Sequence, residues 1–300
     1  MAESFARVGE LEICYETFGD PGDPAMLLIM GLGTQMVAYH DHFCAQLAER
    51  GFFVIRHDNR DIGRSTHLHG ARIPSLAQLL KRDRRSPYTL TDMAGDSVGV
   101  LDCLGIERAH IVGTSMGGMI AQTLAIRYPE RTLSLVSIMS NTGSFWNGQP
   151  ALALYAVLLK PSPGDRESFI NNAVEMFTKL GGSGYEPDVE DLREIATLSF
   201  DRGHDARGSQ RQLWAIVADR DRTPLLRGLK VATTVIHGAE DRLVHPSGGR
   251  ATAKAIPGAR LVMIPGMGHG LPRGAWPAII DAIADTAARA GAPVATPAPR

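Results

Sequence analysis

Residues 113–117 read Gly-Thr-Ser-Met-Gly and lie between an apolar run, Ala109–Val112, and a helix-like segment, Met119–Ala125. A serine between two glycines, on a turn from a strand to a helix, can adopt a strained backbone conformation that presents its hydroxyl above the sheet. Glycine lacks the Cβ that would clash at such a turn. The five-residue pattern alone is a weak signal. With a strand before it and a helix after it, the pattern makes Ser115 the candidate nucleophile.

Strands and helices alternate on both sides of this stretch. The strands are predicted at residues 5–9, 11–18, 25–30, 52–56, 109–112, 132–139, 231–236 and 260–264, and the helices around residues 43–48 and at residues 91–104, 119–125, 248–256 and 275–290. The first two strands form an antiparallel hairpin, because only a short turn separates them. The later alternation requires right-handed crossovers, which predict an α/β fold with a mainly parallel sheet and helices on both faces. Active sites in open sheets of this kind lie at the carboxyl ends of the strands.

The alternation stops between residues 141 and 228, where apolar helical stretches occur without a buried strand. We therefore predict an inserted helical cap at residues 141–228 and an α/β core formed by residues 1–140 and 229–290. Residues 291–300 are small and rich in proline, a composition typical of a disordered tail.

Composition restricts the classes of function. The chain has 300 residues, 44% of them apolar, and a formal net charge of −1, so it can bury a large core. The densest basic run, residues 81–85, lies beside polar and turn residues rather than interleaved aromatic ones. Such a run is typical of a solvated loop, and nucleic-acid binding is not expected.

The ends of the chain and its cysteines indicate a reducing compartment. Residues 1–7 include an acid and lack the apolar core of a signal peptide, and no run approaches the length of a membrane span. Cys14, Cys44 and Cys103 are widely spaced, which suggests neither a disulfide framework nor a zinc knuckle. We predict a cytoplasmic protein without integral membrane association, in which all three cysteines are reduced and buried.

A serine hydroxyl attacks an ester only with the help of a base, which a third group must hold in one tautomer. His269 follows the last predicted strand, within the glycine-rich segment Pro265–Gly270. Asp241 follows the strand at residues 231–236, and its position three residues after Gly238 favours it over its neighbour Glu240. The order nucleophile, acid, histidine, each at a strand end, predicts a catalytic triad.

These features resemble the α/β-hydrolase superfamily over nearly the whole chain apart from the cap and the tail. Three segments resemble, more narrowly, the bacterial serine esterases related to aclacinomycin methylesterase and the mycobacterial LipG-type esterases. They are Ile29–Gly33 (Ile-Met-Gly-Leu-Gly), Asp58–Ser65 (Asp-Asn-Arg-Asp-Ile-Gly-Arg-Ser) and Pro265–His269 (Pro-Gly-Met-Gly-His). Many relatives have His where this chain has Met30, and Gly where it has Asp61.

The resemblance implies a carboxylic ester hydrolase that acts through an acyl-enzyme. Ser115 would attack the carbonyl, His269 would take its proton, and Asp241 would fix the imidazole. The backbone amides of Leu32 and Met116 would form the oxyanion hole, so the change at Met30 leaves that role intact. Water would then hydrolyse the acyl-enzyme, with no metal or organic cofactor.

Other polar residues have simpler interpretations. His237 and His245 are predicted to be a strand-end residue and a loop or helix-cap residue. The pairs His40/His42 and His67/His69 each lack a matching second cluster, so surface placement is favoured over metal ligation. The loop Asp58–Ser65 is predicted to brace neighbouring loops by hydrogen bonds, and Gly31–Gly33 lacks the Lys-Ser/Thr of a phosphate loop.

The predicted cap is expected to select a small to medium, uncharged, hydrophobic ester, because its apolar residues would lie over the strand ends. They are Phe145, Trp146, Leu152, Leu154, Tyr155, Val157, Leu158, Leu159, Met176, Phe177 and Trp214. Thioester cleavage, C–C bond hydrolysis or cofactor-free perhydrolysis on the same triad stay open, as does a ligand receptor with residual hydrolysis. No heptad pattern or exposed apolar strip indicates an oligomeric state.

Overall fold

The computed structural model describes residues 3–152, 154 and 163–291. An eight-stranded sheet forms its centre, with the order β1-β2-β4-β3-β5-β6-β7-β8. The strands are β1 (Ser4–Val8), β2 (Leu11–Phe18), β3 (Ala25–Ile29), β4 (Phe53–His57), β5 (Ala109–Thr114), β6 (Thr132–Ile138), β7 (Ala232–Gly238) and β8 (Arg260–Ile264). Strand β2 is antiparallel to β1 and β4, and the other pairs are parallel. The predicted fold class and the N-terminal hairpin are confirmed.

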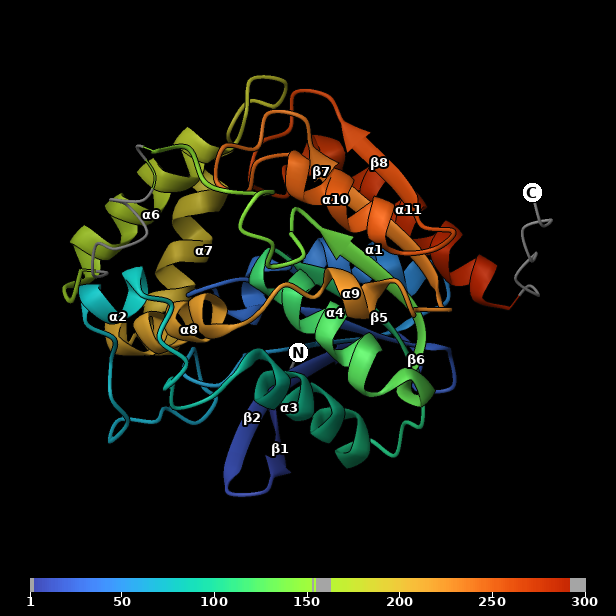
Figure 1. Cartoon of the computed structure of the whole chain (residues 1–300), viewed down its shortest axis with the longest axis horizontal. Coiled ribbons are helices and arrows are strands. Elements are labelled where there is room, and N and C mark those ends of the chain that lie inside the picture. Colours follow the sequence, from blue (N-terminus) through green and yellow to red (C-terminus); the bar gives the residue numbers. More distant parts are fainter. Residues whose placement is uncertain (1–2, 153, 155–162, 292–300) are drawn as a thin grey trace.

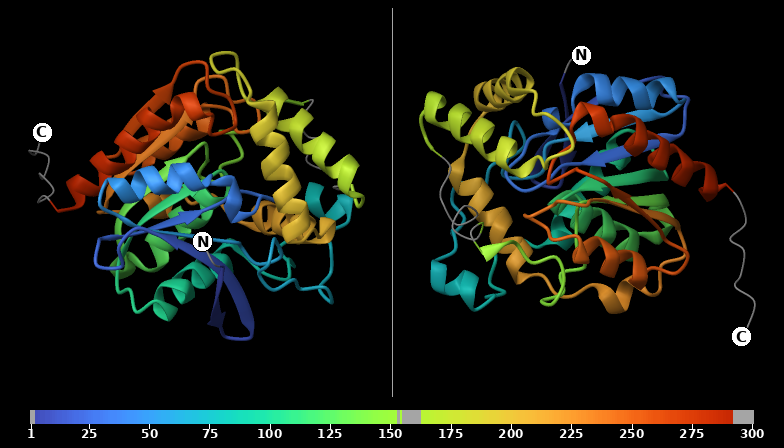
Figure 2. Two further views of the ribbon diagram at one scale, coloured as in Figure 1. Left: turned by 180° about the vertical axis from the view of Figure 1, so that it is seen from behind. Right: turned by 90° about the horizontal axis from the view of Figure 1, so that it is seen from above.

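Helices cover both faces of the sheet (Figures 1 and 2). Those described are α1 (Asp41–Glu49), α2 (Leu76–Leu80), α3 (Leu90–Cys103), α4 (Met116–Arg127), α6 (Arg166–Leu180), α7 (Val189–Arg202), α8 (Ala206–Ala218), α9 (Thr223–Leu226), α10 (Ser247–Ala255) and α11 (Trp276–Ala290). Leu27 and Ile111 pack with α3 and α4 on one face, and Met26 and Val112 pack with α1 and α11 on the other. Because both faces are buried, these strands are continuously apolar.

Capping boxes explain two of the differences between the observed helices and the predictions. Helix α3 begins at Leu90 rather than Thr91, because the side chain of Thr89 accepts a hydrogen bond from the Asp92 amide and the Asp92 carboxylate accepts one from the Thr89 amide. The short helix α2 was not predicted, although Ser75 and Gln78 form the same kind of capping box. In both cases the cap sets where the helix starts.

Helices α6, α7 and α8 separate β6 from β7 in the chain and lie at one end of the sheet (Figure 1). Among the described residues between β6 and β7 no strand occurs, as expected. The division into a core and a cap stays a prediction. The tail beyond Gly291 and the apolar residues Tyr155, Val157, Leu158 and Leu159 lie outside the described residues.

Two buried ion pairs fix α7 and α8 to the loop that follows β4. Arg202 Nη2 at the end of α7 lies 2.9 Å from Asp58 Oδ2. On α8, Arg211 donates to both carboxylate oxygens of Asp61, at 2.8 and 2.7 Å, and both side chains are 0% exposed. Asp61 has a φ of 68°, a conformation that favours glycine, which agrees with the glycine found there in many resembling proteins.

The prediction that all three cysteines are buried is wrong for one of them. Cys14 and Cys44 are buried, and burial raises the pKa of each thiol to about 12. Cys103 is exposed, because it lies on the solvent-facing side of the last turn of α3.

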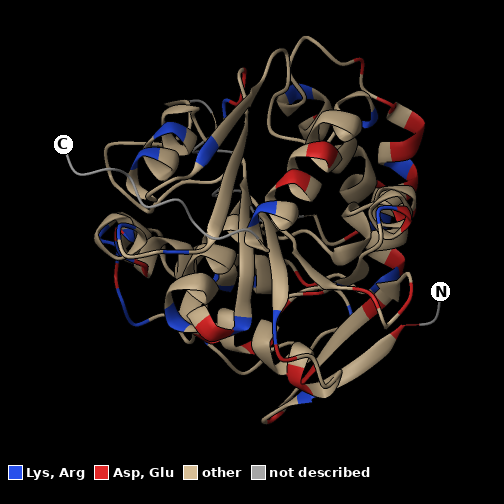
Figure 3. Cartoon of the chain, turned by 90° about the vertical axis from the view of Figure 1, so that its right-hand side faces the viewer, with Lys and Arg blue, Asp and Glu red and all other residues tan. Residues whose placement is uncertain are grey.

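Charges of both signs are interspersed over the helices and loops visible in Figure 3, as the balanced composition leads one to expect. Within the described part of the chain, no helix combines the length and the apolar character needed to cross a bilayer.

We predict that Arg211→Met lowers the free energy of unfolding by about 3–5 kcal/mol, because the variant leaves the buried Asp61 carboxylate without its guanidinium. Urea denaturation measures this loss. The matched variant Arg50→Met removes an exposed pair with Asp281 and should cost less than about 1 kcal/mol. Equal losses in the two variants would contradict the role given to the buried pair.

Candidate active site

The turn between β5 and α4 holds Ser115 in a strained backbone conformation, with φ of 57° and ψ of −120°. A Cβ on Gly113 would lie 2.1 Å from the Gly117 carbonyl oxygen, and one on Gly117 would lie 1.9 Å from the Ile29 carbonyl oxygen. Neither glycine can therefore be replaced without moving the backbone. Ser115 itself is only partly buried.

The structure brings Ser115, His269 and Asp241 together at the carboxyl edge of the sheet, on the loops after β5, β8 and β7. His269 Nδ1 lies 2.7 Å from Asp241 Oδ2, and His269 Nε2 lies 3.0 Å from Ser115 Oγ. An ionised carboxylate only accepts hydrogen bonds, so Nδ1 carries the proton and Nε2 is left to accept from the serine hydroxyl. This arrangement has the geometry of a nucleophile, its base and a group that orients the base.

Asp241 is almost fully buried, and both oxygens of its carboxylate take part in hydrogen bonds. Its Oδ1 accepts from the amides of Leu243 and Val244, at 2.9 and 2.8 Å. Burial raises the pKa of this carboxyl, but the charges and hydrogen bonds of His269 and His237 outweigh burial and lower the pKa to about 2. The carboxylate is therefore ionised at neutral pH.

The segment after β3 lies directly against the nucleophile. A Cβ on Gly31 would be 3.1 Å from the Cβ of Ser115. Among the described residues, neither the Leu32 amide nor the Met116 amide has a hydrogen-bond partner. An oxyanion hole requires free backbone donors near the nucleophile; Met116 directly follows Ser115, and Leu32 directly follows Gly31.

The competing candidates have other hydrogen-bond partners. The Glu240 carboxylate accepts from the amide and hydroxyl of Ser183, at 2.7 and 2.8 Å, and has no hydrogen bond to His269. His237 lies near the end of β7 as predicted, and its Nε2 also lies 3.4 Å from Asp241 Oδ2, a contact that sequence reasoning missed. His245 hydrogen-bonds Ser247 in the loop before α10.

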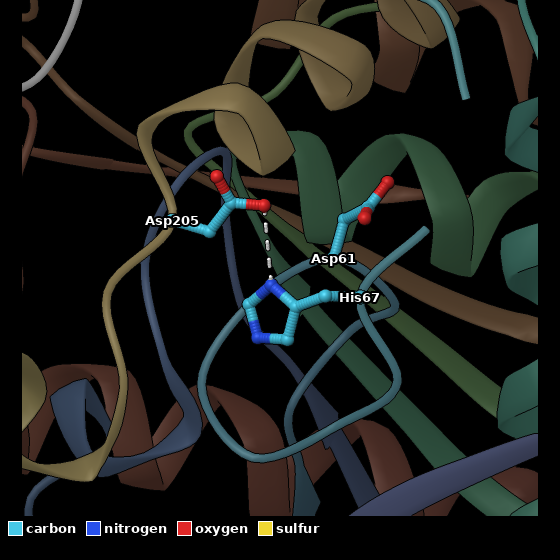
Figure 4. Close-up of side chains that lie close together, drawn as sticks. All are labelled: Asp61, His67 and Asp205. Carbon is cyan, nitrogen blue, oxygen red and sulfur yellow. Dashed lines mark ion pairs between the residues drawn. The ribbon is translucent and has the colours of Figure 1, made fainter. Parts of the chain in front are cut away.

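His67 has partners that its local sequence does not reveal, since Asp61 and Asp205 lie beside it (Figure 4). Its Nδ1 lies 3.4 Å from Asp205 Oδ2. These ligand types and their spacing resemble a metal site, but Arg211 already donates to both Asp61 and Asp205. A guanidinium thus supplies the positive charge that the two carboxylates need, and a role in structure is favoured.

The apolar residues of the predicted cap do not share one environment. Phe145, Trp146 and Leu152 are largely exposed, whereas Trp214 is buried and donates from Nε1 to the Asp83 carbonyl. Trp214 therefore packs α8 against the 81–85 segment. That apolar cap residues line a substrate pocket therefore stays a prediction.

Comparisons with known proteins identify the family of the chain. The profile of a family described as alpha/beta hydrolase fold matches residues 24–179. The chain is 30% identical over 287 residues to the rhodomycin D methylesterase DauP of Streptomyces sp. strain C5, covering 88% of this chain and 90% of that protein. It is 30% identical, with the same coverage, to the rhodomycin D methylesterase DnrP of Streptomyces peucetius. The crystal structure of an enol-lactonase from Burkholderia xenovorans superimposes with a TM-score of 0.72 at 24% identity, over 94% of this chain and 99% of the other, a likeness of fold alone.

The pKa of Asp241 predicts a dependence of stability on pH. A carboxyl whose pKa falls from about 4 in the unfolded chain to about 2 in the folded one stabilises the fold above pH 4, and loses that contribution as the pH falls toward 2. We expect the Asp241→Asn variant to lack this contribution, about 2 kcal/mol. The difference in free energy of unfolding between parent and variant should therefore shrink as the pH falls.

Urea titrations from about pH 6 to about pH 3 measure this difference. The exposed variant Asp281→Asn is the control and should follow the parent. A difference between parent and Asp241→Asn that stays constant with pH would contradict the ionised, histidine-paired state of Asp241.

Proposed function

The chain belongs to the alpha/beta hydrolase fold family and is a carboxylic ester hydrolase, and on that premise we propose that it cleaves its ester through a covalent acyl-enzyme on Ser115. The observation that carries this proposal is the continuous hydrogen-bonded chain from Ser115 through His269 to Asp241. The three side chains come from three different strand ends, and nothing in the local sequence of one requires the presence of the others.

In the first step Ser115 Oγ attacks the carbonyl carbon of the ester while His269 Nε2 takes the hydroxyl proton. The Asp241 carboxylate holds Nδ1–H and stabilises the imidazolium that forms. Because Nε2 already lies 3.0 Å from Oγ, proton transfer needs little movement.

The negative charge that develops on the carbonyl oxygen is stabilised by the amides of Leu32 and Met116. In enzymes of this type, one such donor contributes about 3–4 kcal/mol to the barrier reduction. The tetrahedral intermediate then collapses, the bond from carbon to the alcohol oxygen breaks, and the alcohol leaves with the proton from His269 Nε2.

Hydrolysis of the acyl-enzyme repeats these steps with water. His269 Nε2 takes a proton from water, and the oxygen attacks the acyl carbon. Collapse of the second intermediate releases the carboxylic acid and returns the proton to Ser115 Oγ. These side chains and two backbone amides supply every proton transfer and charge contact, so the mechanism uses no cofactor or metal.

The proposed substrate is a small to medium, uncharged, hydrophobic ester. The two rhodomycin D methylesterases are named for the removal of a methyl ester, and their similarity extends over 88% of this chain. Methyl and other short alkyl esters of hydrophobic acids are therefore the first class to examine. A cytoplasmic location stays part of the proposal.

Other reactions on the same triad compete with this choice of substrate. Thioester cleavage, C–C bond hydrolysis and perhydrolysis need the same nucleophile and base, whereas epoxide hydrolysis and dehalogenation would need a carboxylate at position 115. A ligand receptor could also retain the residues. The intact hydrogen-bonded triad favours an enzyme over a receptor.

We predict that the parent protein hydrolyses short-chain p-nitrophenyl esters and that Ser115→Ala lowers kcat by about four to six orders of magnitude. Release of p-nitrophenol measures the rate. Ser140→Ala is a matched control, because Ser140 is fully buried against α4 and its hydroxyl has no partner among the described residues. It should retain the activity of the parent.

Two results would contradict the proposal: no turnover of any ester by the parent, or turnover by Ser115→Ala equal to that of the parent. A series of acyl and alcohol chain lengths then identifies the preferred ester, and matched thioesters test the competing reaction.

A further inference from the structure

Gln212 on α8 joins that helix to the segment Met30–Thr34, which carries the proposed oxyanion donor Leu32. Its Oε1 accepts from the Gly33 amide at 2.9 Å, and its Nε2 donates to the Arg60 carbonyl at 2.8 Å. The side chain is 0% exposed. A buried side-chain amide whose oxygen and nitrogen both form hydrogen bonds is held in one orientation.

Helix α8 is packed too closely against these loops for Gln212 to shift easily. A Cβ on Gly33, which has a φ of +63°, would lie 2.9 Å from Ser209 Oγ of α8. A Cβ on Gly208 would lie 2.0 Å from the Asp61 carbonyl oxygen. Together with the ion pair between Arg211 and Asp61, these contacts fix the helix turn that carries Gln212.

The other hydrogen bonds of the segment act on the peptide that carries the Leu32 N–H and on its two neighbours. The Met30 carbonyl accepts from Asn59 Nδ2 at 2.9 Å, and the Gly31 and Leu32 carbonyls accept from the amide and the hydroxyl of Thr34 at 3.3 and 3.1 Å. Gln212 holds the amide of Gly33. The peptide between Gly31 and Leu32 is thus held at its carbonyl and lies between two held peptides, while its own N–H is left without a partner among the described residues.

We propose that Gln212 is a positioning residue that keeps the Leu32 N–H aimed at the oxyanion. The inference rests on the proposed function, because it assigns a support to the oxyanion hole named there. The hydrogen bonds of Gln212 go to Gly33 and Arg60 rather than to the nucleophile or its base, so it acts through the Gly33 amide. Without it, the peptide that carries the Leu32 N–H depends on the 3.3 Å hydrogen bond from the Thr34 amide to the Gly31 carbonyl, and Gly31 has no Cβ to restrict rotation.

A glutamine fits this position better than an acid or an apolar residue of similar size. Its amide supplies both the acceptor for the Gly33 amide and the donor for the Arg60 carbonyl. A carboxylate would lose the donor, and a methionine would leave both backbone groups buried and unpaired.

The test compares transition-state binding with substrate binding in Gln212→Met. We expect kcat to fall about tenfold or more while KM stays within about twofold, because a misaimed donor weakens only the tetrahedral state. The affinity for an alkylboronic acid, which forms a tetrahedral adduct with Ser115, should fall by the same factor as kcat/KM. Titration with a fluorophosphonate gives the concentration of active protein, so a smaller folded fraction cannot mimic the effect.

The matched control is Gln122→Met. Gln122 is also a fully buried glutamine with two hydrogen bonds, to Ser137 Oγ and from Arg222 Nε, and neither bond involves the Met30–Thr34 segment. We expect its boronic acid affinity to equal that of the parent. Unchanged kcat/KM and boronic acid affinity in Gln212→Met, or equal losses in the control, would overturn the inference.

If Gln212→Met does not fold, Gln212→Glu provides the test, because it keeps an acceptor for the Gly33 amide. Boronic acid affinity within about threefold of the parent supports the inference, and a loss of about tenfold or more contradicts it. Absence of turnover by the parent itself would instead refute the proposed function, so the two failures are distinguishable.

Discussion

The turn at Ser115 is the constraint on which the rest of the structure depends. Gly113 packs against the Gly117 carbonyl, and Gly117 packs against the Ile29 carbonyl, too closely for either glycine to carry a Cβ. Strands β3 and β5 and helix α4 are therefore in close contact at this turn. That contact holds Ser115 at a φ of 57° and lifts its hydroxyl to the edge of the sheet. Strands β7 and β8 end at the same edge of the sheet. Asp241 and His269, on the loops that follow these strands, can therefore reach Ser115.

A second layer of contacts holds the loops that surround the nucleophile. Asp58 and Asp61 follow β4 and bind Arg202 of α7 and Arg211 of α8, in pairs that are almost fully removed from water. Breaking such pairs is costly because one buried charge is left unpaired. The helices between β6 and β7 therefore hold the loop that follows β4, and Gln212 of α8 also accepts a hydrogen bond from Gly33 in the proposed oxyanion segment.

Local patterns allowed the fold and the candidate triad to be predicted from the sequence. Apolar periodicity located the strands, and Ser115, Asp241 and His269 each directly follow a strand or its turn. Contacts between distant segments could not be predicted in this way: Gln212 and Gly33 are 179 residues apart, and Arg211 and Asp61 are 150 apart. Burial of Cys103 was predicted wrongly because residue type alone does not show which side of a helix end faces solvent.

The central claim is that Ser115 carries the acyl group, and mass spectrometry of the quenched enzyme tests it most directly. Protein mixed with excess p-nitrophenyl ester and stopped in acid within the first turnover should gain the mass of one acyl group, located by peptide mapping on Ser115. Turnover without a covalent adduct, or an acyl group on another residue, would contradict the account.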